Sequence, residues 1–434
     1  MKLKILLINP WIYDFAAVNL WSIPLGILKV AEYLSRYDVE LDFIDCTENY
    51  RRTGPFGTGK YQKETVSKPG CIQSIPRRFG RYGIRVEELQ RFLRQKSPFD
   101  MVFMTSIMSY WYPGVHKAVE IIKAEYKNIP LILGGIYATL WHEHAANTSG
   151  ADYIYRGGVG EGIHSALNTF GFRIREKQEE TTPYYRLGLY NHFRFVPILT
   201  STGCPYRCSY CASVLFNEKF VQRDVSAVLK EMGELRGMGV RDFAVYDDAL
   251  LVNAETHIKP LLREIITRRL DVRFHCPNGL HARFIDEELA SLMKESGFQT
   301  VRLSLETTEK ERQEQTGGKV TSEHLFRAVN ALKRQGFTRG NTGVYLMYGL
   351  PGQGLDEVEQ GVEFLKHLSV KIHLTEFSPI PGTRCWDDIL KRGIMHDEID
   401  PLLTNNTVFS WLFSDYDPSA LKKLKLSVKE YNAS

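Results

Sequence analysis

The sequence predicts an α/β protein in which a doubly wound, Rossmann-like domain is followed by a partial (β/α)6 TIM barrel. Short apolar runs alternate with amphipathic stretches along most of the 434 residues. Runs that are apolar on both faces are typical of parallel strands covered by helices. The alternation breaks at residues 171–195 and then restarts with six countable repeats. We therefore expect two α/β domains joined by a linker over 171–195.

The first domain is expected over residues 1–170. An amphipathic stretch at 23–35 and another at 115–125 predict helices between its strands. A doubly wound sheet binds ligands beyond the carboxyl ends of its strands. The predicted strands of this domain are 4–9, 39–45, 101–106, 130–134 and 153–155.

The second domain is expected over residues 196–390. Six repeats are too few for a closed eight-stranded barrel, so we expect an open barrel with its chemistry at the carboxyl ends of the strands. Residues 391–434 are expected to be a C-terminal helical tail, with a helix over 419–431 packed on the barrel. The predicted strands are 196–201, 242–247, 271–276, 300–305, 342–348 and 373–378, and the predicted helices are 223–237, 254–269, 286–296, 322–335 and 355–368.

Composition excludes several classes of protein. The chain is 43% apolar and 24% charged, which excludes a disordered or low-complexity protein. Its net charge of +4 is too small to favour nucleic acid, and this disfavours an RNA-modifying enzyme. No apolar run is long enough for a membrane span, and the N-terminus lacks a signal-peptide pattern. We expect a cytoplasmic protein.

Three of the seven cysteines lie within eight residues. Cys204, Cys208 and Cys211 have the spacing C-x3-C-x2-C and follow the first barrel strand. A structural zinc site would need a fourth cysteine or histidine at a suitable spacing, and neither His192 nor His257 provides one. Three thiolates instead suit a 4Fe-4S cluster with one iron open to a ligand. The cluster is therefore the expected occupant.

This motif resembles the signature of the radical S-adenosylmethionine (SAM) superfamily. The resemblance implies that the open iron binds the amino acid end of SAM, and that one electron cleaves SAM to methionine and a 5′-deoxyadenosyl radical. It extends to polar and glycine-bearing strand ends over residues 196–385. By this resemblance the SAM-binding residues are Tyr210, Asp247, Asp248, Glu306, Tyr348 and Gly349.

The first domain resembles the cobalamin-binding domain of one large subgroup of these enzymes. Glycines at strand ends would let the backbone approach a corrin or its nucleotide tail. The chain lacks the Asp-x-His-x-x-Gly motif that supplies a lower cobalt ligand in many cobalamin domains, so no such ligand is assigned. Tyr110 and Trp111 could cover a corrin face or pack in the core. The resemblance implies cobalamin contacts from Pro10, Gly26, Tyr110, Trp111, Gly134, Gly135, Tyr137, Gly157 and Glu161.

Residues 51–85 form a basic insertion with nine lysines and arginines and a single acid, Glu64. Gly54–Lys60 matches a phosphate-loop pattern formally, but Tyr61 replaces the Ser or Thr that holds magnesium, and we reject that interpretation. Two interpretations stay open for this apparently irregular loop. It is a solvated excursion, or it is a lid whose arginines hold an anionic group of cobalamin or substrate.

Together these features predict cobalamin-dependent methylation of an unactivated carbon. The alternatives are cobalamin-dependent cyclisation or rearrangement, and a radical SAM enzyme whose first domain has lost cobalamin and docks substrate or a partner. The expected partners are a small-molecule or peptide substrate and a one-electron reductant such as flavodoxin or ferredoxin. No catalytic acid or base is assigned. Cys276 and Cys385 are either radical relays or ordinary buried thiols.

Overall fold

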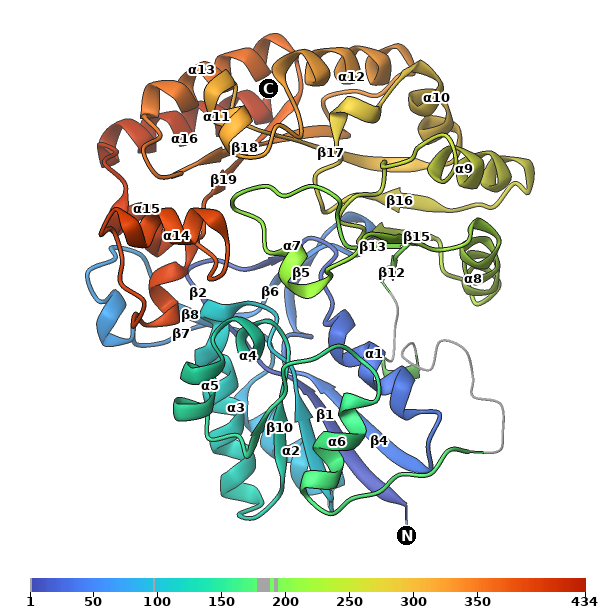
Figure 1. Ribbon diagram of the computed structural model, residues 1–434, viewed down its shortest axis with the longest axis vertical. Coiled ribbons are helices and arrows are strands. Elements are labelled where there is room, and N and C mark those ends of the chain that lie inside the picture. Colours follow the sequence, from blue (N-terminus) through green and yellow to red (C-terminus); the bar gives the residue numbers. More distant parts are fainter. Residues whose placement is uncertain (1, 97, 178–187, 191–193) are drawn as a thin grey trace. The chain divides into compact units, whose positions relative to one another are not determined.

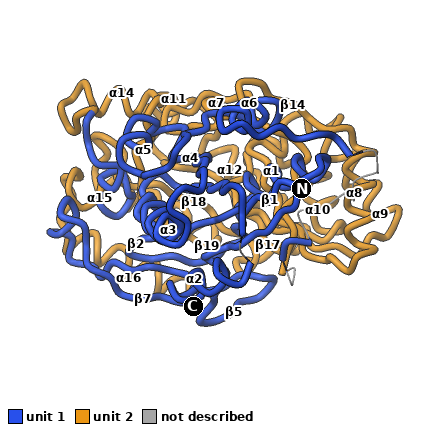
Figure 2. Tube along the Cα trace, turned by 90° about the horizontal axis from the view of Figure 1, so that it is seen from below, with its two compact units in different colours: residues 1–193, 398–408 blue, residues 194–397, 409–434 orange. Residues whose placement is uncertain are grey.

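The computed structural model describes residues 2–96, 98–177, 188–190 and 194–434. It divides into two compact units, each described separately below (Figure 2). Unit 1 comprises residues 1–193 and 398–408, and unit 2 comprises residues 194–397 and 409–434. Most of the expected linker, residues 171–195, lies outside the described residues.

Unit 1 is built on a parallel sheet of five strands in the order β11-β10-β9-β1-β4. The chain order reverses between β1 and β9, which is the switch point of a doubly wound fold. This confirms the predicted architecture. The strands are β1 (Leu3–Asn9), β4 (Val39–Asp45), β9 (Met101–Met104), β10 (Leu131–Leu133) and β11 (Tyr153–Ile154), and the helices are α1 (Leu25–Leu34), α2 (Val86–Lys96), α3 (Tyr112–Glu125), α4 (Ile136–Leu140), α5 (His142–Thr148) and α6 (Gly162–Thr169).

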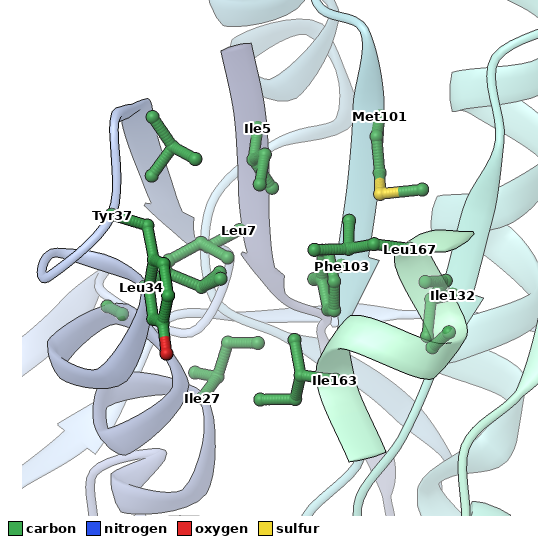
Figure 3. Close-up of a cluster of buried hydrophobic side chains, with 13 residues drawn as sticks. Ile5, Leu7, Ile27, Leu34, Tyr37, Met101, Phe103, Ile132, Ile163 and Leu167 are labelled. Atoms are coloured by element: carbon green, nitrogen blue, oxygen red, sulfur yellow. The ribbon is translucent and has the colours of Figure 1, made fainter. Parts of the chain in front are cut away.

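A buried apolar cluster fixes α1 and α6 against this sheet (Figure 3). Ile27 and Leu34 from α1 and Ile163 from α6 meet strand residues such as Leu7 and Phe103, all buried. Removing this much apolar surface from water is the main stabilising contribution to such a layer. The loops that follow the strands lie at the carboxyl edge of the sheet.

The basic insertion folds into short antiparallel strands, so the expected irregular loop is wrong. Its strands join β2 and β3 in two three-stranded sheets, β2-β8-β7 and β3-β6-β5. A small core of Ile12, Tyr61 and Tyr82 supports them. Lys60 lies in a strand rather than before a helix, in agreement with rejection of the phosphate loop. The strands are β2 (Ile12–Asp14), β3 (Val18–Asn19), β5 (Tyr50–Thr53), β6 (Gly59–Tyr61), β7 (Lys63–Thr65) and β8 (Gly80–Tyr82).

Unit 2 is built on a six-stranded parallel sheet whose order follows the chain, β12-β15-β16-β17-β18-β19. Its helices lie on the outer side of the sheet (Figure 1). Sequential order with β12 and β19 at the edges is the open barrel that the sequence predicts. The strands are β12 (Val196–Ile198), β15 (Asp242–Val245), β16 (Arg273–His275), β17 (Phe298–Glu306), β18 (Thr342–Tyr348) and β19 (Lys371–Glu376), and the main helices are α8 (Val225–Gly237), α9 (Ile258–Thr267), α10 (Glu287–Glu295), α12 (Ser322–Arg334) and α13 (Leu355–His367).

Shorter elements complete unit 2. A hairpin of β13 (Ser201–Thr202) and β14 (Val221–Gln222) follows β12, and α7 (Ser213–Phe216) lies within it. The expected C-terminal helix is α16 (Pro418–Ala433), which packs on α13 and β19. The remaining helices are α11 (Lys310–Gln315), α14 (Arg384–Lys391) and α15 (Asn406–Phe413). Within the described residues, no helix is long and apolar enough to cross a membrane.

Candidate functional site

The three clustered cysteines lie in the loop that follows β13, at the carboxyl end of the first barrel strand. All three are free thiols, partly exposed at Cys204 and Cys208 and exposed at Cys211. Burial raises the pKa of Cys204 to about 11, and the neighbouring Cys208 and Cys211 add to this increase, which places the three sulfurs in one neighbourhood. Three thiolates this close need a cationic centre between them. The donor set therefore fits an iron–sulfur cluster.

No three His, Cys, Asp or Glu side chains of the described chain converge on a single metal ion.

Segments distant in sequence hold this loop in shape. The Ser209 N–H donates to the Thr316 carbonyl at 3.2 Å, and the Cys385 N–H donates to the Ser209 carbonyl at 2.9 Å. The buried Cys385 thiol lies 3.2 Å from the Ser209 hydroxyl, which gives it a structural contact. Cys276 is also buried, and this raises its pKa to about 12. Burial of both thiols, together with the hydroxyl contact of Cys385, favours the interpretation of Cys276 and Cys385 as ordinary buried thiols.

Glu306 is brought to the same place by the end of β17. Its φ is +68°, a conformation that non-glycine residues adopt at a cost and that is enriched at functional sites. The Lys319 ammonium lies 3.4 Å from its carboxylate. Burial and the Glu306 carboxylate raise the pKa of Tyr210 well above its ordinary value, and the Tyr210 hydroxyl hydrogen-bonds that carboxylate. Two predicted site residues therefore meet beside Cys208, together with Lys319, which the sequence analysis did not identify.

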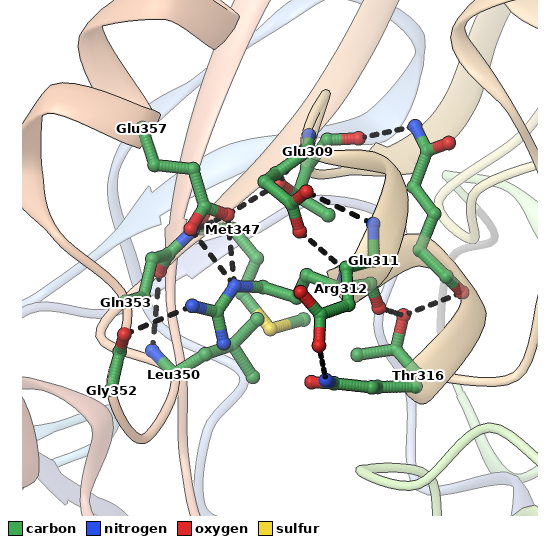
Figure 4. A network of polar contacts seen from close by, with 12 residues as sticks. Glu309, Glu311, Arg312, Thr316, Met347, Leu350, Gly352, Gln353 and Glu357 are labelled. Atoms are coloured by element: carbon green, nitrogen blue, oxygen red, sulfur yellow. Dashed lines mark hydrogen bonds and ion pairs between the residues drawn. The ribbon is translucent and has the colours of Figure 1, made fainter.

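A polar network ties the end of β17 to the end of β18 (Figure 4). The Thr307 hydroxyl donates to Glu357 at 2.5 Å, and Arg312 Nε donates to the same carboxylate at 2.9 Å. Arg312 also donates to the Gly352 carbonyl at 3.0 Å. Arg312 and Glu357 stand on helix faces where charged residues are ordinary, so no sequence signal marked them. Their hydrogen bonds connect the segment after β17, whose last residue is Glu306, to the segment after β18.

The two predicted aspartates differ in burial and in hydrogen-bond partners. Asp247 is buried, and its carboxylate accepts hydrogen bonds from the Thr200 N–H, the Thr200 hydroxyl and the Ser201 hydroxyl, at 3.0, 2.7 and 2.7 Å. These hydrogen bonds tie Asp247 to the strand that leads to the cysteine loop, and its role toward SAM stays a prediction. Asp248 is exposed. Its carboxylate accepts a hydrogen bond at 2.5 Å from the hydroxyl of Ser213, which lies two residues after Cys211.

The side chain of Tyr348 is 1% exposed and lies on the helix-facing side of β18, where its hydroxyl donates to Glu376 and the Lys425 ammonium stands 4.9 Å from its ring. The side chain therefore contacts α16, and a contact of SAM with the backbone of this segment stays a prediction. Gly349, with a φ of +86°, is at the carboxyl end of β18, and its N–H donates to the Tyr416 hydroxyl at 3.0 Å.

In unit 1, several predicted residues gather at the switch point of the sheet. Pro10, Trp111 and Ser106 line a small pocket after β1 and β9. The Trp111 indole donates to Asp14 at 2.8 Å. Gly135 has a φ of +90°, and a Cβ there would lie 2.5 Å from the Ser106 carbonyl oxygen. Gly134 precedes it at the end of β10.

The other predicted residues of unit 1 differ in exposure. Tyr137 is fully buried, with its hydroxyl 2.6 Å from His144 Nδ1 and its ring stacked on Tyr112, so its assignment as a cofactor contact is corrected to the core. Tyr110 is buried as well, which matches the packing alternative. Gly26, Gly157 and Glu161 are exposed, and their role toward cobalamin stays a prediction.

Residues 198–365 match the radical SAM superfamily. An uncharacterised methyltransferase of Pyrococcus horikoshii is 27% identical over 48% of this chain and 46% of its own length. Cytidylyl-2-hydroxyethylphosphonate methyltransferase of Streptomyces wedmorensis is 22% identical over 91% of this chain and 83% of its own. The match thus spans less than half of the Pyrococcus protein.

A solved structure resembles the chain over both units. TsrM of Kitasatospora setae, a radical SAM methyltransferase with cobalamin and a [4Fe-4S] cluster bound, matches with a TM-score of 0.65 and 17% identity, over 97% of this chain and 83% of its own. A second TsrM structure, with tryptophan substrate and a SAM analogue, has a TM-score of 0.66. At this identity the likeness establishes the fold.

Proposed function

Because residues 198–365 form a radical SAM domain, we propose that the protein is a cobalamin-dependent radical SAM methyltransferase that methylates an unactivated carbon of a small molecule. The observation that carries the proposal is the meeting of the cysteine loop with Glu306, Tyr210 and Lys319 at the carboxyl ends of the barrel strands. A [4Fe-4S] cluster held by Cys204, Cys208 and Cys211 would supply the electron that cleaves SAM.

The chain's own residues would orient SAM beside that cluster. The Glu306 carboxylate offers acceptors for the ribose hydroxyls, and its positive φ directs it from the last position of β17. The neighbouring strand of the sheet is β18, and Gly349 directly follows it. Adenine would lie against the backbone at Gly349. The hydrogen bonds of Arg312 and Glu357 keep both strand ends in place, which lowers the cost of ordering the site on binding.

Unit 1 is the proposed cobalamin domain. Cobalamin would carry the methyl group between SAM and substrate. The support is its doubly wound sheet, whose switch point lies where such folds bind ligands, together with the likeness to TsrM over both units. Gly135 lets the backbone after β10 lie close to Ser106 and keeps this edge free of a side chain.

Anaerobic reconstitution tests the proposal. The expected result is iron and sulfide at the content of one cluster, a bound corrin in the optical spectrum, and formation of 5′-deoxyadenosine from SAM with a reductant such as reduced flavodoxin. SAM labelled in its methyl group should pass the label to product. Label absent from a product that still requires cobalamin would favour cyclisation or rearrangement.

Cobalamin itself needs a separate control. A chain that cleaves SAM but retains no corrin after reconstitution would remove cobalamin from the proposal and leave unit 1 as a docking domain. Triple replacement of Cys204, Cys208 and Cys211 by alanine should abolish SAM cleavage while leaving any corrin bound, because the two cofactors are assigned to different units.

A further inference from the structure

The strands of unit 2 have one face covered by helices and one inner face. On β18, Leu346 lies against Gly361 of α13, since a Cβ on Gly361 would stand 2.9 Å from the leucine side chain. Side chains alternate along a strand, so Gly343 and Tyr345 point to the inner face. Parallel register places Arg302, Gly343 and Lys371 in one row, and Ser304, Tyr345 and His373 in the next.

Arg302 and His373 share the space above Gly343. A Cβ on Gly343 would stand 2.5 Å from His373 Nε2 and 3.2 Å from Arg302 Nη1, so only glycine leaves room for both side chains. The His373 ring lies 5.5 Å from the Tyr345 ring, and the Tyr345 hydroxyl is committed to the Pro277 carbonyl at 2.8 Å. The inner face therefore concentrates donors at this point.

These donors lack an anionic partner within the described part of the chain. Arg302 Nη1 donates to the Val301 carbonyl at 3.2 Å, and the guanidinium also hydrogen-bonds the Tyr345 side chain, but no carboxylate of the described residues forms an ion pair with Arg302. His373 Nε2 is buried with no hydrogen-bond partner. Burial lowers the pKa of Arg302, and burial together with Arg302 and Lys371 lowers the pKa of His373 to about 3. The neighbourhood is therefore positive and partly dehydrated.

Arg273, on β16, shows the contrasting arrangement. It is paired with Asp242, which also lies 2.9 Å from His275 Nε2. The sheet thus neutralises one arginine and leaves the other without a counter-charge. A partly buried, unpaired guanidinium destabilises a fold, and such a group is expected where a ligand supplies the opposite charge.

We propose that Arg302 and His373 form a subsite for an oxyanion of the substrate, a carboxylate or a phosphonate, on the inner face of the barrel. The guanidinium matches two oxygens of such a group, and the imidazole adds a third donor when Nε2 carries the proton. Lys371, in the same row as Arg302, adds positive potential. The inference rests on the proposed function and narrows its substrate to an anionic small molecule.

The test measures anion binding to the full chain in the absence of SAM. Methylphosphonate and sodium acetate are titrated separately by calorimetry at fixed ionic strength, and the stronger of the two identifies the anion class. Saturable binding is expected for at least one. Arg302→Met should weaken it by at least about tenfold, the loss expected for one charge-assisted hydrogen bond, and Arg302→Lys should weaken it less. Binding that is not saturable, or that is unchanged in Arg302→Met, overturns the proposal.

Stability of the free protein provides a second readout. Arg302→Met is expected to raise the Tm without anion, because it removes an unpaired buried charge, whereas the matched control Arg273→Met should lower it, because Asp242 loses its partner. An equal loss of Tm in both variants would make Arg302 structural and overturn the proposal. SAM cleavage, assayed separately, depends on the cluster, so failure of anion binding is distinguishable from failure of the proposed function.

Discussion

Gly317 lies directly against Cys208. Its φ is +117°, and a Cβ on it would stand 3.1 Å from the Cys208 Cα. This contact sets how closely the segment after β17 approaches the cysteine loop. Residues more than a hundred positions apart in sequence thus determine the shape of the proposed cluster site.

Gly317→Ala is expected to impair cluster assembly. The added methyl both strains the backbone and displaces the loop at Cys208. Gly318→Ala is the matched control, because Gly318 also has a positive φ, +60°, but a Cβ there would meet nothing within 4 Å. Iron content after reconstitution should fall in Gly317→Ala and stay near that of the parent in Gly318→Ala. Equal iron in the two variants would contradict the role of the contact.

Asp247→Asn should destabilise unit 2 by roughly 2 kcal/mol, since an amide nitrogen would face donors from Thr200 and Ser201. Urea denaturation followed by circular dichroism measures this. Asp248→Asn, at an exposed position, should leave the free energy of unfolding unchanged. If Asp247→Asn were as stable as the parent and lost only SAM affinity, the assignment of Asp247 as a SAM ligand would be supported.

The two α/β folds could be predicted from the sequence because apolar runs alternate with amphipathic stretches along both units. The site is harder to predict, because one residue of shift in a strand exchanges its two faces. Glu306 was found correctly as a carboxylate at a strand end. For Tyr348, nothing in the sequence distinguishes the face toward α16, where its side chain lies, from the inner face. The sequence did not identify Arg302, because only the structure shows that no carboxylate of the described residues forms an ion pair with it.

Short segments account for the remaining differences. The strands of the basic insertion are three or four residues long, too short for a periodic signal, and their pairing joins residues such as Tyr13 and Arg81 that are distant in sequence. Tyr137 was expected to contact cobalamin because its segment resembles part of a cobalamin-binding domain. The structure instead begins α4 at Ile136, and that turn carries the tyrosine into the core.

Unit 1 should lose stability in mild acid through His116. Burial and the neighbouring His144 lower the pKa of His116 from 6.5 to about 4, although Asp400 opposes this decrease. The folded-state pKa lies below the unfolded one, so the neutral ring stabilises the fold fully above pH 6.5, and this contribution is lost as the pH falls toward 4. We expect a loss of about 2 kcal/mol across that range. Denaturation at a series of pH values should show a shallower dependence in His116→Gln, and an unchanged slope would contradict this assignment.

The basic insertion offers a matched pair of arginines that separates its two interpretations. Arg81 is buried: its guanidinium lies 2.5 Å from the Glu64 carboxylate and 5.3 Å from the centre of the Trp11 ring. Arg52, in contrast, is exposed on β5 opposite Lys60. Arg81→Met should lower the free energy of unfolding by about 1–2 kcal/mol through lost packing and cation–π attraction. Arg52→Met should change it by less than about 0.5 kcal/mol. If the insertion also holds an anionic group, Arg52→Met will weaken cobalamin or substrate binding at unchanged stability, and a variant that binds both as the parent does leaves the exposed arginines as solvated surface.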